Sequence, residues 1–225
     1  KQKTEILDCT LRDGSYVLNY NFTDFETSLI SKLLYESGIN FVEVGHGVGL
    51  GASEKIFSSF CSDEKYIEAA NLAKKNNQNK VGSFCFSNLA SKDKINSAFK
   101  AGLDFIRFGV NPETFKKDLN LIRYSKNLGL EVYINFIKSY NYSPKKISNL
   151  SRIFEQEGTD GVYIVDSAGG MMPNDIKEYV LAINKKIINK NFQIGFHGHN
   201  NLGLANANCI SAIEAGATLI DSSLM

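Results

Sequence analysis

Short apolar runs alternate along this chain with longer segments that carry helical periodicity. The runs are rich in β-branched and aromatic residues, and they predict strands at residues 6–10, 40–45, 80–86, 105–110, 131–137, 161–167, 193–199 and 218–224. Parallel strands need crossover connections, which place helices over the outer face of the sheet. Eight such units favour an α/β fold of the closed (β/α)8 TIM-barrel type over a doubly wound open sheet.

Capping signals mark the start of several expected helices. Thr23 and Glu26 form a capping box, and helices are expected to open at Ser143-Pro144 and at Pro173. After the capping box, the periodicity predicts an apolar stripe that packs on the sheet, formed by Phe25, Leu29, Ile30, Leu33 and Leu34.

The length of 225 residues suits one barrel, and no linker or low-complexity tract marks an internal boundary. We therefore expect a single catalytic domain over residues 1–225. The sequence stops directly after the eighth expected strand, so we expect a barrel truncated before its last helix. Further residues or a neighbouring subunit should then cover Leu219 and Leu224, and whether the chain forms a homo-oligomer is left open.

Composition excludes several classes of function. Lys and Arg number 25 against 24 Asp and Glu, so no excess positive charge favours nucleic acid as a partner. No apolar run approaches the roughly 20 residues of a membrane span, and no secretory signal opens the sequence. The four cysteines form no C-x-x-C pair and read as buried free thiols. A cytoplasmic protein without a membrane partner is the expectation.

Polar residues follow the strands at the end of a barrel where active sites form. His197 and His199 alternate on the seventh expected strand, so their side chains point to one face. Asp13 after the first strand can complete a set of two imidazoles and one carboxylate, which suits Mn2+, Mg2+, Co2+ or Zn2+. A structural pair of hydrogen-bonded histidines is the alternative. Arg12 either neutralises Asp13 or holds the negative charge of an enolate or carboxylate.

Two further residues are candidates at the same mouth. Ser167, in a glycine-rich loop after the sixth strand, offers a hydroxyl, although the loop can equally be a simple tight turn. Glu43 on the second strand can line the barrel beside a substrate. Alternatively, it is the buried partner of a basic side chain, either Arg107 or Lys80.

Four ordered segments carry a resemblance to a known superfamily. The first reads LDCTLRDG over residues 7–14, and the others occupy residues 42–50, 162–171 and 197–204. Together they resemble the DRE-TIM metallolyases (HMGL-like), and within that superfamily they are most similar to the 4-hydroxy-2-oxovalerate aldolases. The resemblance covers nearly the whole chain. It implies a metal-dependent lyase that cleaves or forms a carbon–carbon bond through a pyruvate-type enolate.

The same resemblance assigns roles to residues. It implies Asp13, His197 and His199 as ligands of Mn2+ or Mg2+, Arg12 as the group that stabilises the enolate, and Ser167 beside the pyruvyl group. A small 2-oxo acid is the implied substrate. An aldehyde dehydrogenase partner is implied only if a C-terminal domain follows.

One position departs from the aldolase pattern. The aldolases carry a basic histidine three residues after the signature aspartate, where this chain has Tyr16. With an ordinary pKa of about 10, Tyr16 would need help from the cation or Arg12 to accept a proton near neutrality. His46 is the other candidate base. The condensing synthases usually carry Glu-Gln where this chain has Ser15-Tyr16, which favours the aldolase branch.

Three other functions are weighed against the aldolase. A Claisen-condensing acyltransferase of the isopropylmalate or homocitrate synthase type shares the last motif. A non-catalytic scaffold with a degenerate site would explain Tyr16. A nucleotide-dependent oxidoreductase is suggested by the G-x-G-x-x-A pattern over residues 47–52, but the next strand ends in Ser87 and not in the acidic residue that binds ribose.

Overall fold

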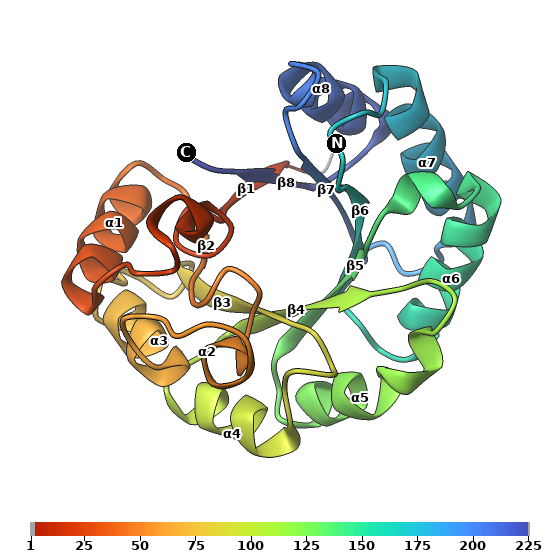
Figure 1. Cartoon of the computed structure of the whole chain (residues 1–225). Coiled ribbons are helices and arrows are strands. Elements are labelled where there is room, and N and C mark those ends of the chain that lie inside the picture. Colours follow the sequence, from red (N-terminus) through yellow and green to blue (C-terminus); the bar gives the residue numbers. More distant parts are fainter. Residues whose placement is uncertain (1–2, 225) are drawn as a thin grey trace.

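Eight parallel strands close into a barrel in the computed structural model, which describes residues 3–224 (Figure 1). The strands follow in chain order around the barrel, and β8 pairs with β1 through a register that joins Leu7 to Asp221. This confirms the expected TIM barrel. The strands are β1 (Glu5–Asp8), β2 (Phe41–Glu43), β3 (Lys80–Cys85), β4 (Phe105–Val110), β5 (Glu131–Phe136), β6 (Gly161–Asp166), β7 (Gln193–Gly198) and β8 (Leu219–Ser222).

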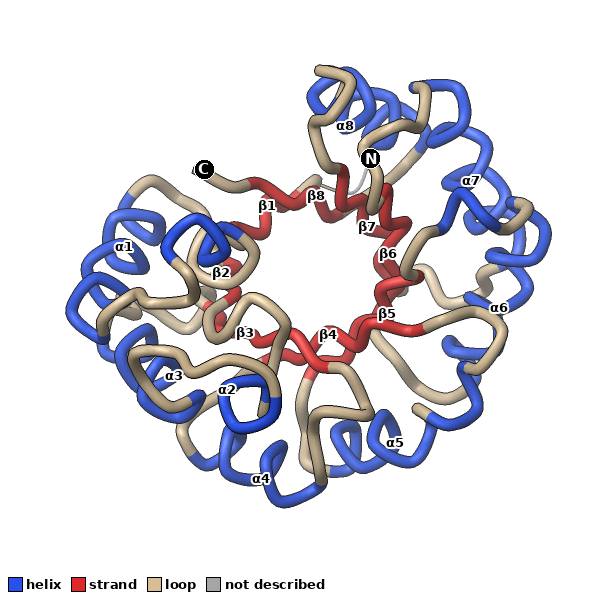
Figure 2. The backbone as a smooth tube through the Cα atoms, in the orientation of Figure 1, coloured by secondary structure: helices blue, strands red, loops and turns tan. Residues whose placement is uncertain are grey.

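Helices surround the strands as an outer ring (Figure 2). They are α1 (Asp24–Glu36), α2 (Ala52–Lys55), α3 (Asp63–Leu72), α4 (Lys92–Lys100), α5 (Leu119–Asn127), α6 (Pro144–Gln156), α7 (Pro173–Lys186) and α8 (Ala205–Ala215), with short 3-10 turns η1 (Gly14–Leu18), η2 (Phe115–Lys117) and η3 (Ser139–Asn141). Within residues 3–224 no helix follows β8. Figure 1 accordingly shows β1 and β8 side by side where the ring is open between α1 and α8.

Most strands end one or two residues before the expected position, and β1 shows the reason. The backbone N–H groups of Arg12, Asp13 and Gly14 all donate to the carbonyl oxygen of Cys9, at 3.1, 2.7 and 3.2 Å. This turn bends the chain out of the strand directly after Asp8. Thr10 and Ser167, which were expected on strand ends, therefore lie on turns over the mouth of the barrel, whereas His197 lies within β7.

The stripe expected on α1 is correct only for Leu34, which is buried, and for Ile30, which packs against the core, while the capping box is confirmed. Phe25 is 72% exposed, and Leu29 and Leu33 are also exposed. The buried face is rotated away from them, because small hydroxyl side chains allow α1 to approach its neighbours closely. That face comprises Thr27, Ser31, Leu34 and Tyr35. In contrast, α6 begins at Pro144 and α7 at Pro173, as predicted.

Alternate residues of each strand fill the barrel interior, as the two-residue period of a strand requires. A compact interior cluster comprises Leu7, Cys9, Phe41, Phe105, Tyr133, Tyr163, Val165 and Leu219. Gly82 makes room for this packing, because a Cβ atom there would lie 2.0 Å from the Phe105 ring. The expectation that Leu219 needs an outside cover is wrong, since Leu219 points into the interior and is fully buried.

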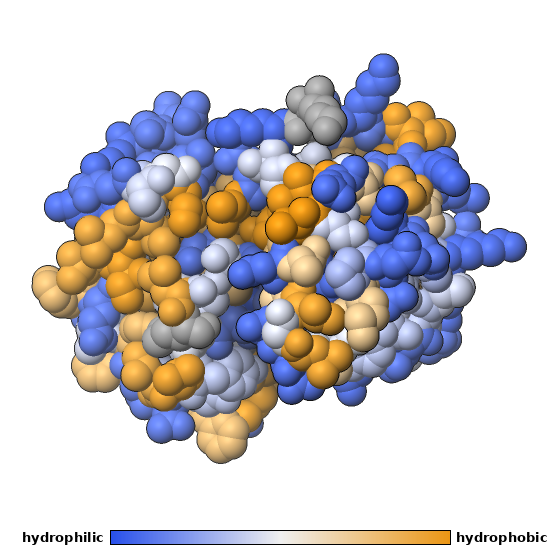
Figure 3. Space-filling view, turned by 90° about the horizontal axis from the view of Figure 1, so that it is seen from above, coloured by the Kyte–Doolittle hydropathy of each residue, from blue (hydrophilic) through white to orange (hydrophobic). Residues whose placement is uncertain are grey.

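The outer surface is mostly polar with several apolar areas (Figure 3). Exposed apolar side chains occur on the elements that border the open part of the ring, with Ile6 on β1 and Ile210 and Ile213 on α8. Leu224 is exposed as well, at 72%. Throughout residues 3–224, no helix has both the length and the hydropathy needed to cross a membrane. All four cysteines are free thiols, as predicted.

Candidate active site

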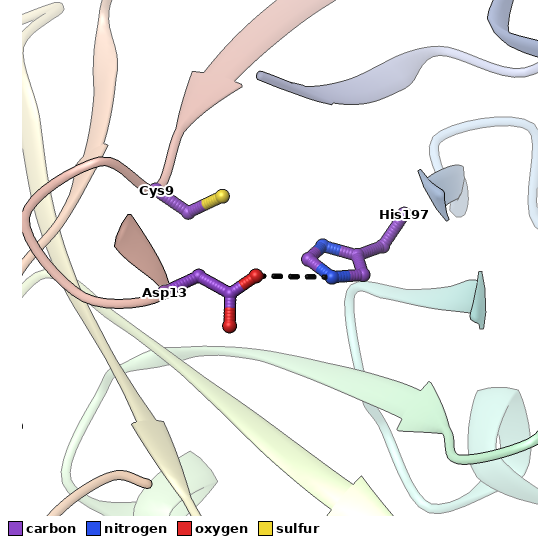
Figure 4. Close-up of side chains that lie close together, drawn as sticks. All are labelled: Cys9, Asp13 and His197. Carbon is purple, nitrogen blue, oxygen red and sulfur yellow. Dashed lines mark ion pairs between the residues drawn. The ribbon is translucent and has the colours of Figure 1, made fainter. Parts of the chain in front are cut away.

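Asp13, His197 and His199 meet at the carboxyl end of the barrel. Oδ2 of Asp13 lies 3.5 Å from Nε2 of His197 and 3.8 Å from Nε2 of His199. Figure 4 shows Asp13 and His197 pointing toward one another across the mouth. The two histidines come from the end of β7, and Asp13 comes from the turn that follows β1. Residues far apart in the sequence are therefore joined because β8 closes the barrel between them.

The Nδ1 nitrogen of each imidazole already has a hydrogen-bond partner. Nδ1 of His197 lies 2.6 Å from Oδ2 of Asp221, and Nδ1 of His199 lies 3.0 Å from the carbonyl oxygen of Asp166. Both partners are acceptors, so each Nδ1 carries the proton and donates it. This fixes the tautomer that leaves a lone pair on each Nε2. Both lone pairs belong to the atoms nearest Asp13.

The separation between Asp13 and each imidazole fits a shared divalent cation. Two donor atoms each about 2.1 Å from one ion lie roughly 3 to 4 Å apart, which is the separation found between Asp13 and the two imidazoles. Histidine ligands of metals commonly donate their second N–H to a carboxylate or a carbonyl, as both do here. Among the described residues, the group whose ligand atoms all lie within 4.8 Å of one another is Cys9, Asp13 and His197, and it does not include His199.

Arg12 stands next to these donors and is held from two sides. Its Nη1 donates to Oδ1 of Asp13 and its Nε to Oε2 of Glu43, both at 2.6 Å. The guanidinium also lies over the Phe84 ring, 4.8 Å from its centroid. Burial would raise the pKa of Asp13, but Arg12, followed by His197 and His199, lowers it. The carboxylate thus stays charged near neutral pH.

Glu43 does not lie beside the cavity as expected for a substrate-binding residue. It is fully buried inside the barrel and binds Arg12 and Arg107, which confirms one of the alternatives considered for it. Burial would raise the pKa of Glu43, but Arg107 and Arg12 lower it to about 2. Its role is to orient guanidinium groups.

A cavity of about 490 Å³ opens directly above Arg12, Asp13, His197 and His199. The rest of its wall is largely apolar and includes Tyr16, Val17, Phe84, Phe86, Ile137 and Val165. The charged groups and the two imidazoles therefore gather at one side, while apolar side chains enclose the remaining space. Such a cavity suits a small anionic ligand with a short apolar portion.

Ser167 lines this cavity, as expected, and its Oγ accepts a hydrogen bond from the backbone N–H of Lys138 at 3.2 Å. Asp166 shapes the loop around it by accepting from the N–H groups of Gly170 and Met171, at 3.2 and 3.0 Å. Asn135 on β5 also lines the cavity, although the sequence did not single it out. Its Oδ1 is buried without a hydrogen-bond partner among the described residues.

Tyr16 lines the mouth of the cavity from η1 and is half exposed. Burial and the neighbouring Tyr20 raise its pKa above the ordinary value. The hydroxyl therefore stays protonated near neutral pH and is suited to donating a hydrogen bond. Gly47 provides the space for both rings, because a Cβ atom there would lie 2.8 Å from Tyr16 and 2.9 Å from Tyr20.

His46 does not join the cavity. It is fully buried, its ring stacks on Tyr20 with centroids 4.0 Å apart, and its Nδ1 accepts from the N–H of Val48. Burial lowers its pKa, so it is neutral near pH 7. Tyr20, whose backbone has a positive φ of 65°, covers one face of this imidazole, and no motif in the sequence indicated that turn. The structure thus brings together every proposed site residue except His46 and Glu43.

Comparison with known proteins decides the family. The HMGL-like family model matches residues 3–225, which is nearly the entire sequence. The chain belongs to the HMGL-like family. It is 37% identical to a 4-hydroxy-2-oxovalerate aldolase of Geobacillus genomosp. 3, in a match that covers 99% of this chain and 65% of the relative.

A second relative is named for a different activity. The chain is 34% identical to an oxaloacetate decarboxylase of Mycobacterium tuberculosis, over 98% of this chain and 64% of that protein. The sequence thus spans just under two thirds of the length of these curated relatives. Among solved structures, the carboxyl transferase domain of Rhizobium etli pyruvate carboxylase matches with a TM-score of 0.83 at 17% identity, covering 100% of this chain and 40% of that one, and supports the barrel fold.

Proposed function

We propose that the chain is a divalent-metal-dependent carbon–carbon lyase of the aldolase type, acting on a small 2-oxo acid through a pyruvate-type enolate. The observation that carries the proposal is the convergence of Asp13 Oδ2 with the Nε2 atoms of His197 and His199 beside Arg12. Asp13, His197 and His199 would hold Mn2+ or Mg2+. The cation, when bound, supplies Lewis-acid polarisation of the 2-oxo acid.

Arg12 provides the fixed positive charge that the reaction needs. Cleavage of the bond between C3 and C4 of a 4-hydroxy-2-oxo acid transfers the 4-hydroxyl proton to solvent, releases an aldehyde and leaves the electron pair of the broken bond on an enolate. The Arg12 guanidinium is held by Glu43 and Asp13, so it does not have to reorganise as this negative charge develops. Preorganised donors of this kind each contribute on the order of 100-fold to 1,000-fold in rate.

The cavity wall supplies the remaining functions. Phe84, Phe86 and Val165 give the cavity an apolar wall beside Arg12, which strengthens the attraction between the guanidinium and the enolate until C3 takes up a proton to give pyruvate. Ser167 offers its hydroxyl to the pyruvyl group. Tyr16, protonated near neutral pH, donates a hydrogen bond to the aldehyde oxygen when the reaction runs in the direction of bond formation.

Enolisation of pyruvate tests the proposal directly. Purified protein loaded with Mn2+ should catalyse exchange of the pyruvate methyl protons in deuterated water, followed by proton nuclear magnetic resonance. Chelation should stop the exchange and added Mn2+ should restore it, while oxalate, a mimic of the enolate, should inhibit. A protein that binds one Mn2+ per chain without any exchange would instead be a scaffold.

The second substrate separates the aldolase from a condensing synthase. Incubation of pyruvate with a short aldehyde should yield a 4-hydroxy-2-oxo acid. A product that forms only with an acyl thioester would favour the Claisen-condensing alternative. The apolar wall formed by Val17, Phe86 and Ile137 supports the aldehyde, because it offers no cation to an anionic second substrate.

A further inference from the structure

A continuous chain of buried ion pairs joins Arg12 to His197 around the inside of the barrel. Arg12 Nε donates to Glu43 Oε2 at 2.6 Å, and Arg107 binds both oxygens of the same carboxylate through Nε and Nη2, at 2.7 and 2.6 Å. Arg107 Nη1 then donates to Oδ2 of Asp221 at 2.6 Å. That same Oδ2 atom lies 2.6 Å from Nδ1 of His197. Arg107 is the middle member of the chain.

Stability is a poor explanation for this arrangement. The Arg107 side chain has no exposure, and Glu43 and Asp221 are 0% and 3% exposed. Removing such charges from water costs several kcal/mol per ion, and well-packed apolar side chains often serve a core as well or better. The neighbouring interior of this barrel is indeed apolar and aromatic. An arginine at this depth is better explained by what it orients.

The geometry of Arg107 leaves it little freedom. Its guanidinium uses three of its donors on two carboxylates, and its plane lies over the Tyr163 ring with Cζ 4.8 Å from the centroid. Neither carboxylate lines the cavity above Arg12, although Asp221 lines an adjacent cavity of about 390 Å³ beside His197. Each instead holds one group that does, because Glu43 fixes Arg12 and Asp221 fixes His197.

We infer that Arg107 is a positioning residue that sets the Arg12 guanidinium and the His197 imidazole in one fixed geometry, so that cation binding and enolate binding depend on the same buried group. This rests on the proposed function, which supplies the cation and the enolate. A shift of Arg107 would break its hydrogen bonds to both Asp221 and Glu43. The His197 imidazole and the Arg12 guanidinium would then lose their fixed positions together.

Arg107→Lys tests the inference, because lysine keeps the charge but cannot bridge two carboxylates with a planar fork. Arg123→Lys is the matched control, since Arg123 also binds one carboxylate through two nitrogens but lies on the surface, 57% exposed. Calorimetry would measure the affinity for Mn2+ and, at saturating Mn2+, the affinity for oxalate. Thermal unfolding and the His197 Nδ1–H resonance would be recorded on the same samples.

Arg107→Lys should weaken Mn2+ binding about 10-fold or more, the low end of the effect seen when partners of metal ligands are removed. Oxalate binding should weaken about fivefold or more, and the His197 Nδ1–H resonance should shift. Arg123→Lys should leave all three unchanged. A folded Arg107→Lys protein that has a lower melting temperature but unaltered affinities would overturn the inference, because Arg107 would then be purely structural.

Asp221→Asn covers the case in which Arg107→Lys does not fold. It removes a charge without changing volume, and it is separated from Arg12 by both Arg107 and Glu43. It should weaken oxalate binding at saturating Mn2+ as well as Mn2+ binding itself. Unchanged oxalate affinity would contradict the coupling. Failure of the inference can be told apart from failure of the proposed function. A wild-type protein that binds Mn2+ and oxalate without exchanging pyruvate protons would contradict the lyase proposal and leave the role of Arg107 testable by the same affinities.

Discussion

The two ends of the barrel both carry polar side chains, but they use them differently. At the amino end, Lys80 pairs with Glu131, and the Tyr133 hydroxyl lies 2.6 Å from Oε1 of Gln193 and 3.0 Å from Oε2 of Glu131. At the carboxyl end, Asp13, His197 and His199 approach one another with separations of 3.5 and 3.8 Å, too long for hydrogen bonds.

The amino end is a closed hydrogen-bond network, whereas the carboxyl end is an open one. Side chains at the amino end bind each other, so they stabilise the barrel and leave little for a ligand. At the carboxyl end, the lone pairs of two imidazoles and one carboxylate oxygen converge where a cation can lie. A polar cluster in a barrel therefore indicates function when its donors face a cavity, and stability when they satisfy one another.

Replacing Arg12, the fixed positive charge at the carboxyl end of the barrel, gives the largest expected effect. Arg12→Ala should lower the rate of proton exchange into pyruvate by about 100-fold to 1,000-fold, because the enolate loses a preorganised donor. Mn2+ content should persist, since Asp13, His197 and His199 are unchanged. Metal analysis and exchange kinetics on the same sample would check both statements. Simultaneous loss of metal and activity would show that Arg12 is required to build the site.

The sequence predicted the barrel well because its periodicity is local. The strand expected at residues 105–110 coincides with β4, and capping residues located the starts of α1, α6 and α7. The face of α1 could not be predicted, because Ser31 and Thr27 are buried by close packing and not by hydrophobicity.

The site was predictable only in part, for a related reason. Arg12 and Asp13 lie in the turn after β1 and His197 lies at the end of β7, where barrel geometry assigns them to the mouth. Arg107 and Asp221 instead lie within strands, and only the closed barrel shows that their inward side chains meet. A charged residue at an inward position of an otherwise apolar strand is the signal that could have found them.

Asp63 extends the comparison to a buried carboxylate that belongs to neither of these two clusters. Its Oδ2 accepts from the N–H of Gly51 at 2.7 Å, while its Oδ1 is buried without a hydrogen-bond partner in the described part of the chain. Burial raises its pKa to about 6. Because this value exceeds that of the unfolded chain, the folded state binds the proton more tightly. The stability that this provides is complete below about pH 4 and is lost as the pH rises through 6.

Asp63→Asn should remove this dependence. Between pH 4 and pH 7, the wild type should lose about 2 kcal/mol more of its unfolding free energy than the variant, since about two pKa units separate the folded and unfolded states. Urea unfolding of both proteins at several pH values measures the difference, in which all other titrating groups cancel. Parallel curves would mean that the pKa of Asp63 is the same in the folded and unfolded states.

Lys80→Met tests the closed end, where the smallest effect is expected. Lys80 pairs with Glu131 and lies 4.9 Å from the centroid of the Phe41 ring, but its side chain is 28% exposed. Partly solvated pairs contribute little, so urea unfolding should show a loss below about 1 kcal/mol. Mn2+ affinity and pyruvate exchange should not change, because the interior aromatic cluster separates this end from the mouth. A tenfold change in either would mean that the two ends are coupled through the barrel, and the division into a stabilising end and a functional end would have to be abandoned.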